Sequence, residues 1–341
     1  MKRFLLSAGL MLGVAATTVT AQEYRILNAE KTSYNLFNHL DASLSVGTTG
    51  IGIDVATPVT NWTQLRVGYS FMPRFNYNVP FEIQVGGEKE SKYDAQGKRV
   101  ETKFDRLATM LEDMTGYEVD DEVWMTGRPT YHNLKVLVDV FPFQSDKRWH
   151  VTAGFFWGPS RIADAVNKTE EMPSLLAVGI YNRLYERTMA SYAKGFPYDP
   201  IISVGGFEID GKQEVEAMYK RLSQYGRMGM RVGTKNDGTP YVMEPGTDGM
   251  VKAEVRVNSF KPYIGIGYGG RLVKGSDRLH IGVDLGAMYW GRPSIITHDG
   301  TDLVNDIQKG SIDGKPGNYV KLVRAFHFLP VLDVRLVYSI F

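Results

Sequence analysis

Apolar and polar residues alternate one by one through much of this chain of 341 residues, and this two-residue period is the feature that most constrains its fold. In one stretch, Leu134, Val136 and Val138 share one face, and Lys135 and Asp139 lie on the other. Because successive side chains of a strand point to opposite sides, this pattern predicts strands with one apolar face. The eight predicted strands cover residues 38–48, 50–58, 62–73, 131–142, 148–158, 250–270, 277–291 and 321–341.

The strand predicted at residues 250–270 is irregular, because its apolar phase is odd up to Val257 and even from Ile264. Such a flip marks either a bulge or a turn. A turn at residues 259–262 would give nine strands, whereas a barrel with both ends on one side of a membrane needs an even number. We therefore predict one long strand with an irregular middle and eight strands in total, with ten strands as the alternative.

The composition excludes several classes of function. The 39 Lys and Arg residues nearly balance the 38 Asp and Glu residues, which leaves no basic excess for binding nucleic acid. The chain has no cysteine, so thiolate metal sites, thiol nucleophiles, disulfides and a lipid-modified cysteine are excluded.

The first 21 residues predict a signal peptide. A positive start at residues 1–3 precedes the mostly apolar stretch from Phe4 to Ala16, which is too short to cross a bilayer as a helix. Small residues at Val19 and Ala21 favour cleavage after Ala21. The mature protein would then comprise residues 22–341 and be exported across the inner membrane.

An exported chain with alternating strands can form a membrane barrel or a soluble sandwich. Trp149 and Trp157 stand at the two ends of one apolar face, and Tyr289 ends another. Aromatic residues at both ends of a strand are typical of the girdles of membrane barrels. The pattern therefore predicts an all-β fold, an eight-stranded antiparallel transmembrane β-barrel in the cell outer membrane, in contact with its lipid.

The predicted connections differ greatly in length. Those at residues 58–61, 143–148 and 271–276 are short, whereas three predicted loops at residues 74–130, 159–249 and 292–320 are long. Because membrane barrels have short periplasmic turns and long external loops, we expect the long loops to be extracellular. Helical spacing predicts that they are partly helical, with one helix stopping at Gly116, one starting near Ser174 and one ending at Gly226.

Three segments resemble a known class. The terminal strand Phe328 to Phe341, KPYIGIGYGG at residues 261–270 and GTTGIGID at residues 47–54 are similar to small outer-membrane β-barrel proteins of Gram-negative bacteria, of the OmpA, OmpX and OmpW type. The resemblance implies that Tyr338, Ile340 and Phe341 form the signal read by the barrel-assembly machinery. Phe341 departs from the usual pattern, because it is out of step with the apolar phase of Tyr338 and Ile340.

The polar face of the predicted strands carries nearly balanced charge. An eight-stranded barrel has an interior that its own side chains can fill, and buried charges are tolerated when they are paired. The sequence therefore predicts an internal ion-pair network that plugs the lumen, rather than an open porin. Its predicted members are Asp41, Asp54, Arg66, Lys135, Asp139, Lys252, Glu254, Arg256, Asp284, Asp333 and Arg335.

The histidines are the candidate catalytic groups, because some small barrels are surface enzymes. No histidine lies in a spacing that marks a nucleophile or a metal site, so we predict no catalytic, metal-binding or cofactor-binding residue. The candidates are His132, His150, His280, His298 and His327.

These observations predict an integral outer-membrane barrel with a structural or surface-binding role, whose external loops bind an extracellular protein or glycan. A narrow gated channel for small-molecule uptake is the first alternative. A surface enzyme that modifies lipid or peptide is the second.

Overall fold

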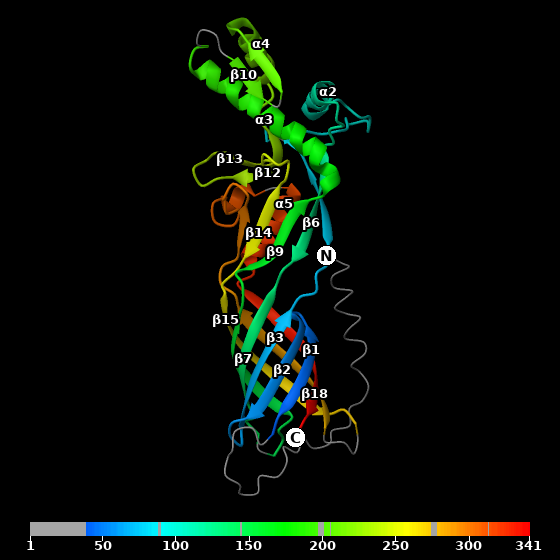
Figure 1. Ribbon diagram of the computed structural model, residues 1–341, viewed down its shortest axis with the longest axis vertical. Helices are drawn as coiled ribbons and strands as arrows, with labels where there is room; N and C mark the ends of the chain where they lie inside the picture. Colours follow the sequence, from blue (N-terminus) through cyan, green and yellow to red (C-terminus); the bar gives the residue numbers. More distant parts are fainter. Residues whose placement is uncertain are drawn as a thin grey trace.

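A computed structural model describes residues 39–87, 90–143, 145–196, 201–204, 206–273, 278–312 and 314–341. The predicted signal peptide lies outside the described residues. Eight antiparallel strands form a closed barrel in the order β1-β18-β16-β15-β8-β7-β3-β2, which confirms the predicted fold class (Figure 1). The barrel strands are β1 (Asp41–Gly47), β2 (Gly50–Pro58), β3 (Thr63–Phe71), β7 (His132–Val140), β8 (Trp149–Trp157), β15 (Phe260–Arg271), β16 (Leu279–Tyr289) and β18 (Phe328–Ser339).

The first and last barrel strands pair with each other and close the wall. Asp41 of β1 lies opposite Ser339 of β18, and the register runs on to Gly47 opposite Asp333. The other side of β1 pairs with β2. The wall therefore has no open strand edge, as a membrane interior requires, because lipid offers no hydrogen bonds to unpaired backbone groups.

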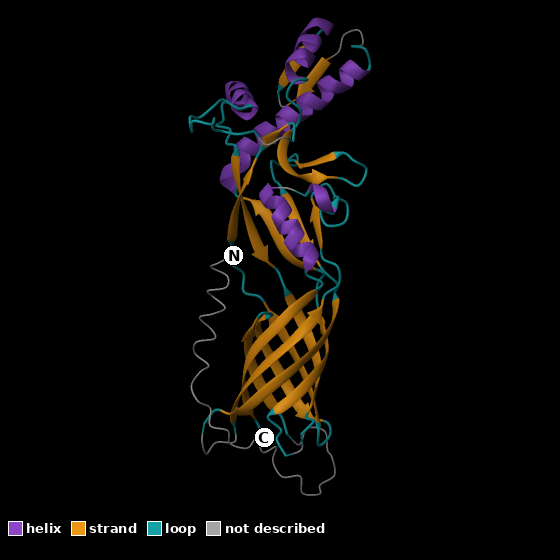
Figure 2. Ribbon diagram, turned by 180° about the vertical axis from the view of Figure 1, so that it is seen from behind, coloured by secondary structure: helices purple, strands orange, loops and turns teal. Residues whose placement is uncertain are grey.

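The long connections form a second folded region, which we call the head (the described residues within 72–131, 158–259 and 290–327; Figure 2). Its largest sheet has the order β17-β14-β9-β6-β4. Its strands are β4 (Tyr77–Glu82), β6 (Glu122–Pro129), β9 (Arg161–Asn167), β14 (Lys252–Arg256) and β17 (Ser294–Thr297). The head sheet therefore contains five connected strands outside the barrel wall.

The head sheet continues one wall of the barrel. Its strands β17, β14, β9, β6 and β4 follow the same order as the barrel strands β16, β15, β8, β7 and β3, and each is joined to its barrel counterpart through only two to five residues. We call these short joints the neck. Pro73, Pro159 and Pro293 lie in it, and proline interrupts a strand ladder because it has no N–H to donate.

The remaining elements lie beside the head sheet or beyond its end farthest from the barrel (Figure 1). A three-stranded sheet has the order β13-β12-β5, and β10 pairs with β11. No helix in the described part of the chain is long and apolar enough to cross a bilayer. These elements are β5 (Gln84–Val85), α2 (Lys103–Thr115), η1 (Thr169–Glu171), α3 (Met172–Ala193), β10 (Ile201–Val204), β11 (Phe207–Asp210), α4 (Lys212–Leu222), β12 (Met228–Thr234), β13 (Pro240–Met243), η2 (Lys309–Ser311) and α5 (Gly314–Ala325).

Three of these helices match the helical spacing in the sequence. Helix α2 begins after Thr102, whose hydroxyl and backbone form a reciprocal capping box with Asp105, and it ends at Gly116 in the left-handed conformation. Helix α3 covers the predicted start near Ser174. Helix α4 ends at Leu222, four residues before the predicted end at Gly226.

Two predicted strand boundaries are wrong. Residues 250–270 form two strands in different sheets, because β14 pairs with β9 and β17 in the head, whereas β15 pairs with β8 and β16 in the barrel. The phase flip between them marks this passage through the neck. Residues 321–325 belong to α5, so β18 begins at Phe328. The second and third long connections therefore run to residues 259 and 327.

Candidate functional site in the barrel

The outer surface of the barrel wall is apolar. Ile264 in β15 is 64% exposed, and Leu44, Ile53 and Leu285 on three other strands are exposed too. Charged side chains lie buried on the opposite face, as Asp284 beside Leu285 and Asp54 beside Ile53 illustrate. In a soluble protein the apolar face would be buried, so this inverted arrangement is one that lipid solvates.

Exposed aromatic residues stand at both ends of the apolar band. At the head end, the predicted girdle residues Trp157 and Tyr289 point outward. At the opposite end, which we call the turn end, the predicted girdle residue Trp149 lies 4.9 Å from Tyr268 between ring centroids. Trp149 and Trp157 are eight residues apart, about 26 Å along a strand and about 20 Å across a bilayer at the tilt of barrel strands. The chain forms a transmembrane β-barrel of the outer-membrane type.

The lumen of this barrel contains a charge network centred on Asp284. Arg66 Nη1 donates to its Oδ2 at 3.2 Å, and Arg335 Nη2 donates to its Oδ1 at 3.1 Å. His150 Nε2 lies 2.8 Å from the same Oδ1 and 3.3 Å from Arg335 Nη2. One carboxylate thus holds two guanidinium groups from β3 and β18, with an imidazole from β8 beside them.

Further ion pairs extend the network along the lumen. Arg66 Nη2 donates to Asp139 Oδ1 at 2.8 Å, and the Thr152 hydroxyl donates to the same oxygen at 2.6 Å. Lys135 Nζ lies 2.6 Å from Asp54 Oδ1. All of these groups are buried, so each charge depends on its partner for the stabilisation that water would otherwise give.

The other two predicted interior acids, Asp41 and Asp333, are held by hydroxyl groups and a histidine. Asp41, near the turn end, accepts a hydrogen bond from the Ser339 hydroxyl at 2.7 Å and lies 3.0 Å from His39 Nε2. Asp333 accepts from the Thr49 hydroxyl at 3.4 Å. The structure therefore brings eight of the eleven predicted network residues into the lumen.

Lys252, Glu254 and Arg256 are not among them, and their prediction as interior residues is wrong. They lie on β14 in the head sheet, where Glu254 pairs with Arg256 at 2.6 Å and Lys252 pairs with Asp248 at 2.5 Å. The side chains of Lys252 and Arg256 are about half exposed. The cause is the neck at residues 257–259, which separates their strand from the barrel.

Lys261 is an interior charge that the sequence analysis missed. Its side chain is 0% exposed, and its Nζ donates to Asn133 Oδ1 at 2.9 Å and to the Ser259 carbonyl at 3.3 Å. It lies 5.7 Å from the centre of the Tyr131 ring. Lys261 is two residues from Tyr263, so both side chains lie on the inner face of β15. The sequence would have indicated this only if the barrel strand had been predicted to start at residue 260.

An apolar layer fills the lumen near Lys261, at the head end. The Phe156 and Tyr263 rings meet edge to face with centroids 5.5 Å apart, and the Tyr131 hydroxyl lies 3.5 Å from Met288 Sδ. The buried residues of this layer are Tyr131, Leu137, Phe156, Tyr263, Met288 and Val331.

Glycines make room for these large interior side chains. A Cβ on Gly267 would lie 2.1 Å from His150 Nε2 and 2.4 Å from Asp284 Oδ1. A Cβ on Gly265 would lie 2.3 Å from the Tyr263 hydroxyl. The glycines of the KPYIGIGYGG segment therefore allow a narrow barrel to hold a ring, an imidazole and a carboxylate at these levels.

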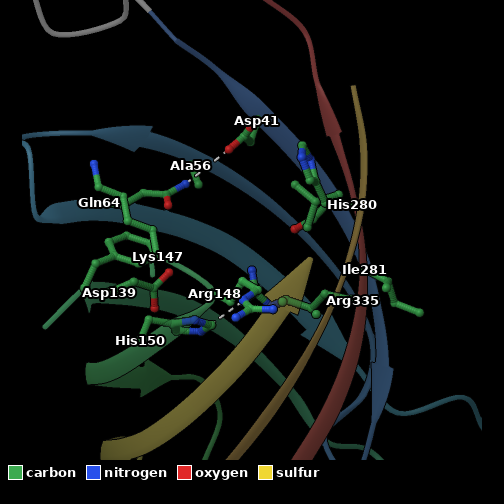
Figure 3. A pocket seen from close by; sticks show the side chains of 15 residues that line it. Asp41, Ala56, Gln64, Asp139, Lys147, Arg148, His150, His280, Ile281 and Arg335 are labelled. Atoms are coloured by element: carbon green, nitrogen blue, oxygen red, sulfur yellow. Dashed lines mark hydrogen bonds between the residues drawn. The ribbon is translucent and has the colours of Figure 1, made fainter. Parts of the chain in front are cut away.

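A small cavity opens into the lumen from the turn end. Figure 3 shows Asp41, His280, His150 and Arg335 around it, on different strands of the wall. The space open to the centres of water molecules is about 40 Å³, enough for about three waters. Organic ligands occupy pockets of about 300 Å³ or more, so this cavity is of a size for water.

The candidate histidines lie in four different places, and only His150 and His280 among them line the lumen cavity. His150 and His280 face the lumen, His132 lies on the outer wall with its ring 5.9 Å from that of Tyr69, His298 is exposed in the head, and His327 lies between α5 and β18. Within the described ranges, no three or more His, Asp or Glu residues are arranged to hold a metal ion. His150 has Asp284 and Arg335 as its hydrogen-bond partners.

The residues of the implied assembly signal end the barrel at the turn end. Strand β18 stops at Ser339, with Tyr338 exposed on the outer wall. The Ile340 N–H donates to the Leu40 carbonyl at 2.8 Å, and the Leu40 N–H donates to the Phe341 carbonyl at 3.2 Å. The Ile340 and Phe341 side chains are both exposed.

No protein-family model and no curated protein matches this chain. Among solved structures it is similar to CarO2 of Acinetobacter baumannii, with 13% identity over 90% of this chain and 100% of that chain and a TM-score of 0.37. CarO of the same species gives 14% identity, coverages of 89% and 99% and a TM-score of 0.37. A major outer membrane protein from Thermus thermophilus gives 12% identity, coverages of 88% and 98% and a TM-score of 0.25.

Proposed function

We propose that the barrel is a sealed anchor in the outer membrane and that the head is displayed at the cell surface, where it binds an extracellular protein or glycan. The observation that carries this proposal is a lumen filled by paired charges, below a head that continues the barrel wall. Each half of the proposal has its own support.

The filled lumen supports a sealed anchor. Asp284, Asp139 and Asp54 hold Arg66, Arg335 and Lys135 in ion pairs inside the barrel, and an apolar layer around Phe156 and Tyr263 fills more of the lumen. Passage of a solute would require breaking these pairs in a region of low dielectric, which costs several kcal/mol for each charge. A gated channel closed by the head alone would instead leave the lumen itself open to water.

The head has the properties of a folded binding region. Side chains from its sheets and helices share one hydrophobic core, in which Leu111, Val123, Tyr181 and Met230 are almost completely buried. Five strand joints of two to five residues hold it on the barrel. Such a region keeps a fixed surface on a rigid support, which lowers the entropy lost when a partner binds.

The lengths of the connections favour an outward-facing head. At the turn end, the connections cover only residues 59–62, 141–148 and 272–278, whereas the long ones all lie at the head end. Outer-membrane barrels place short turns in the periplasm and long connections outside. Tyr338, Ile340 and Phe341 would then lie at the periplasmic rim, where the barrel-assembly machinery would read them.

Single cysteines test the orientation, because the chain has none of its own. Lys194→Cys lies at the end of α3 in the head, and Asn61→Cys lies in the turn between β2 and β3; both residues are exposed. We expect a membrane-impermeant maleimide to label Lys194→Cys on intact cells and Asn61→Cys only after lysis. Labelling of Asn61→Cys alone on intact cells would overturn the proposed display.

The same variants test binding. A bifunctional cross-linker attached to Lys194→Cys on intact cells grown in their natural medium should give a discrete adduct of higher mass, because the proposed partner contacts the head. The Asn61→Cys variant serves as the matched control and should give no such adduct. Absence of an adduct from Lys194→Cys and from further cysteines placed over the head would contradict the binding role.

A further inference from the structure

A groove of about 510 Å³ crosses the outside of the neck where β3 and β7 leave the barrel. It is much larger than the lumen cavity and lies on the lipid-facing side of the wall. Its lining includes Tyr69, Phe71, Arg74, His132, Pro159 and Arg161.

The lower part of the groove is aromatic and continuous with the lipid-facing surface. Tyr69 and Phe71 are exposed on the outer face of β3, and His132 packs against Tyr69. Phe71 is the last residue of its barrel strand, at the same end as Trp157. Because such aromatic ends mark the membrane surface, the groove lies at the level of lipid headgroups.

The upper part of the groove is positively charged. Arg74 is exposed and has no acidic partner within the described residues. Arg161 lies 3.5 Å from Asp164 and 3.4 Å from Glu254, and these pairs are partly exposed. Exposed pairs of this kind are worth only about 1 kcal/mol or less, so both arginines can still bind an anion.

Neighbouring charges on the head sheet keep this region positive. Arg128 lies opposite Asp164, and Arg256 lies opposite Arg161 in the strand register. Arg128 Nε donates to Asn76 Oδ1 at 3.2 Å, and Arg256 pairs with Glu254. Together with the two groove arginines, this surface carries four guanidinium groups against the two carboxylates of Asp164 and Glu254.

We propose that the neck groove binds a phosphate-bearing lipid of the leaflet that surrounds the head end of the barrel. Arg74 and Arg161 bind the phosphate, and an acyl chain lies against Tyr69 and Phe71. A guanidinium group matches phosphate through paired N–H donors. The aromatic floor, which opens directly onto the lipid-facing wall, selects a lipid over free phosphate.

The proposal does not depend on a sealed lumen or on a partner of the head. Only the identity of the leaflet rests on the outward orientation proposed above: with the head outside, the lipid belongs to the outer leaflet. Cysteine labelling tests that orientation, whereas lipid binding to the purified chain tests the groove, so the two can fail separately.

The test is native mass spectrometry of the full-length protein in detergent with dioleoyl phosphatidic acid, dioleoylglycerol and inorganic phosphate as probes. The two lipids share their acyl chains and differ in the phosphate. We expect phosphatidic acid to bind about tenfold more tightly than dioleoylglycerol, as charge-assisted contacts with phosphate predict. Inorganic phosphate in millimolar excess should leave the bound lipid in place.

Variants locate the site. Arg74→Gln should weaken binding of phosphatidic acid about threefold or more, and Arg74→Gln with Arg161→Gln should reduce it to the level of dioleoylglycerol. The matched control is Arg106→Gln, an exposed head arginine paired with Glu101, which should change binding less than about twofold. Heat-modifiable migration on gels verifies that each variant is folded.

Three results would overturn the proposal. Equal binding of the two lipids would remove the role of the phosphate. Displacement by inorganic phosphate would make the groove a site for free phosphate. An equal loss in the Arg106→Gln variant would show that the attraction comes from the overall charge of the head and not from the groove.

Discussion

The barrel and the head bury opposite kinds of side chain. The head encloses Leu111, Tyr181 and Met230, whereas the barrel encloses Arg66 and Lys261, with apolar residues on its outer surface. The strands of both regions have the same two-residue alternation of apolar and polar side chains. The two regions differ in the solvent around them. Lipid stabilises apolar side chains on the outer surface of the barrel, so the polar side chains face the interior, where they pair with one another.

Two isoleucines make the comparison quantitative. Ile264 in β15 of the barrel is 64% exposed, and Ile201 in β10 of the head is 66% exposed. By accessibility alone the two residues are equivalent. Ile264 lies midway between Phe260 and Tyr268, which mark the two ends of the apolar band on its strand, so its exposed surface is in lipid.

The largest effect is expected from the charge network. Asp284→Asn removes the carboxylate that holds Arg66 and Arg335 and leaves two buried guanidinium groups poorly paired. Loss of one partner from a buried pair costs about 3–5 kcal/mol in the free energy of unfolding. Urea unfolding in detergent micelles, followed by tryptophan fluorescence, measures this change.

The control for this variant is Glu216→Gln, which breaks an exposed pair with Lys220 on the head helix α4. It should cost about 1 kcal/mol or less. Equal losses in the two variants would show that the lumen charges do not stabilise the barrel more than surface charges stabilise the head.

The next largest loss of stability is expected when Ile264 is replaced by arginine, with the same substitution at Ile201 for comparison. Ile264→Arg places a charge at the middle of the apolar band and should destabilise the protein by about 2–4 kcal/mol in lipid vesicles. Ile201→Arg, at equal exposure, should change the stability by about 0.5 kcal/mol or less. Similar changes in both variants would contradict the assignment of the barrel exterior to lipid.

A glycine in the same strand tests the packing of the lumen. Gly267→Ala would bring a methyl group against His150 and Asp284, and overpacking of this kind costs about 1–3 kcal/mol. Gly270→Ala, three residues further along β15, meets open space and should be close to neutral. Thermal unfolding of both variants, scored by heat-modifiable migration, decides whether the lumen is tightly filled at the level of Gly267.

The smallest effect is expected at the start of helix α2 in the head. Burial raises the pKa of Asp105, but hydrogen bonds from Thr102 and Arg99 outweigh it and lower the pKa below its usual value. A lowered pKa means that Asp105 stabilises the head at neutral pH and that this stabilisation is lost as the pH falls through the lowered pKa. Asp105→Asn should therefore cost about 1 kcal/mol at pH 7 and less near pH 2.

The measurement for Asp105→Asn is urea unfolding of the variant and the parent protein at both pH values. A difference that stays constant with pH would mean that the charge of Asp105 contributes nothing to the cap.

Most of the barrel could be predicted from the sequence, because the lipid imposes a strict pattern on each strand. Leu134, Val136 and Val138 must face outward, and Lys135 and Asp139 are then fixed on the inside. Three of the head helices were also predicted from helical spacing, and Gly116 marks the end of α2 as expected, whereas α5 was missed because part of it was assigned to the last strand. These signals are local, so a single sequence carries them.

The location of each strand was harder to predict. Lys252, Glu254 and Arg256 alternate with apolar residues in a head sheet just as they would in a barrel wall. Alternation predicts a strand with one apolar and one polar face, but it does not predict whether the apolar face contacts lipid or a protein core. The only trace of the neck at residues 257–259 in the sequence is therefore the phase flip of the apolar residues. Lys261 was missed because the barrel strand that starts after this neck was not recognised as a separate strand.

The most direct test of the sealed anchor is the conductance of the full-length protein in planar lipid bilayers. We predict no stable single-channel steps, because the ion pairs around Asp284 and the apolar layer around Phe156 fill the lumen. Insertion must be verified in the same preparation by protection of the barrel from protease. Large, stable conductance steps from protein shown to be inserted would contradict the account.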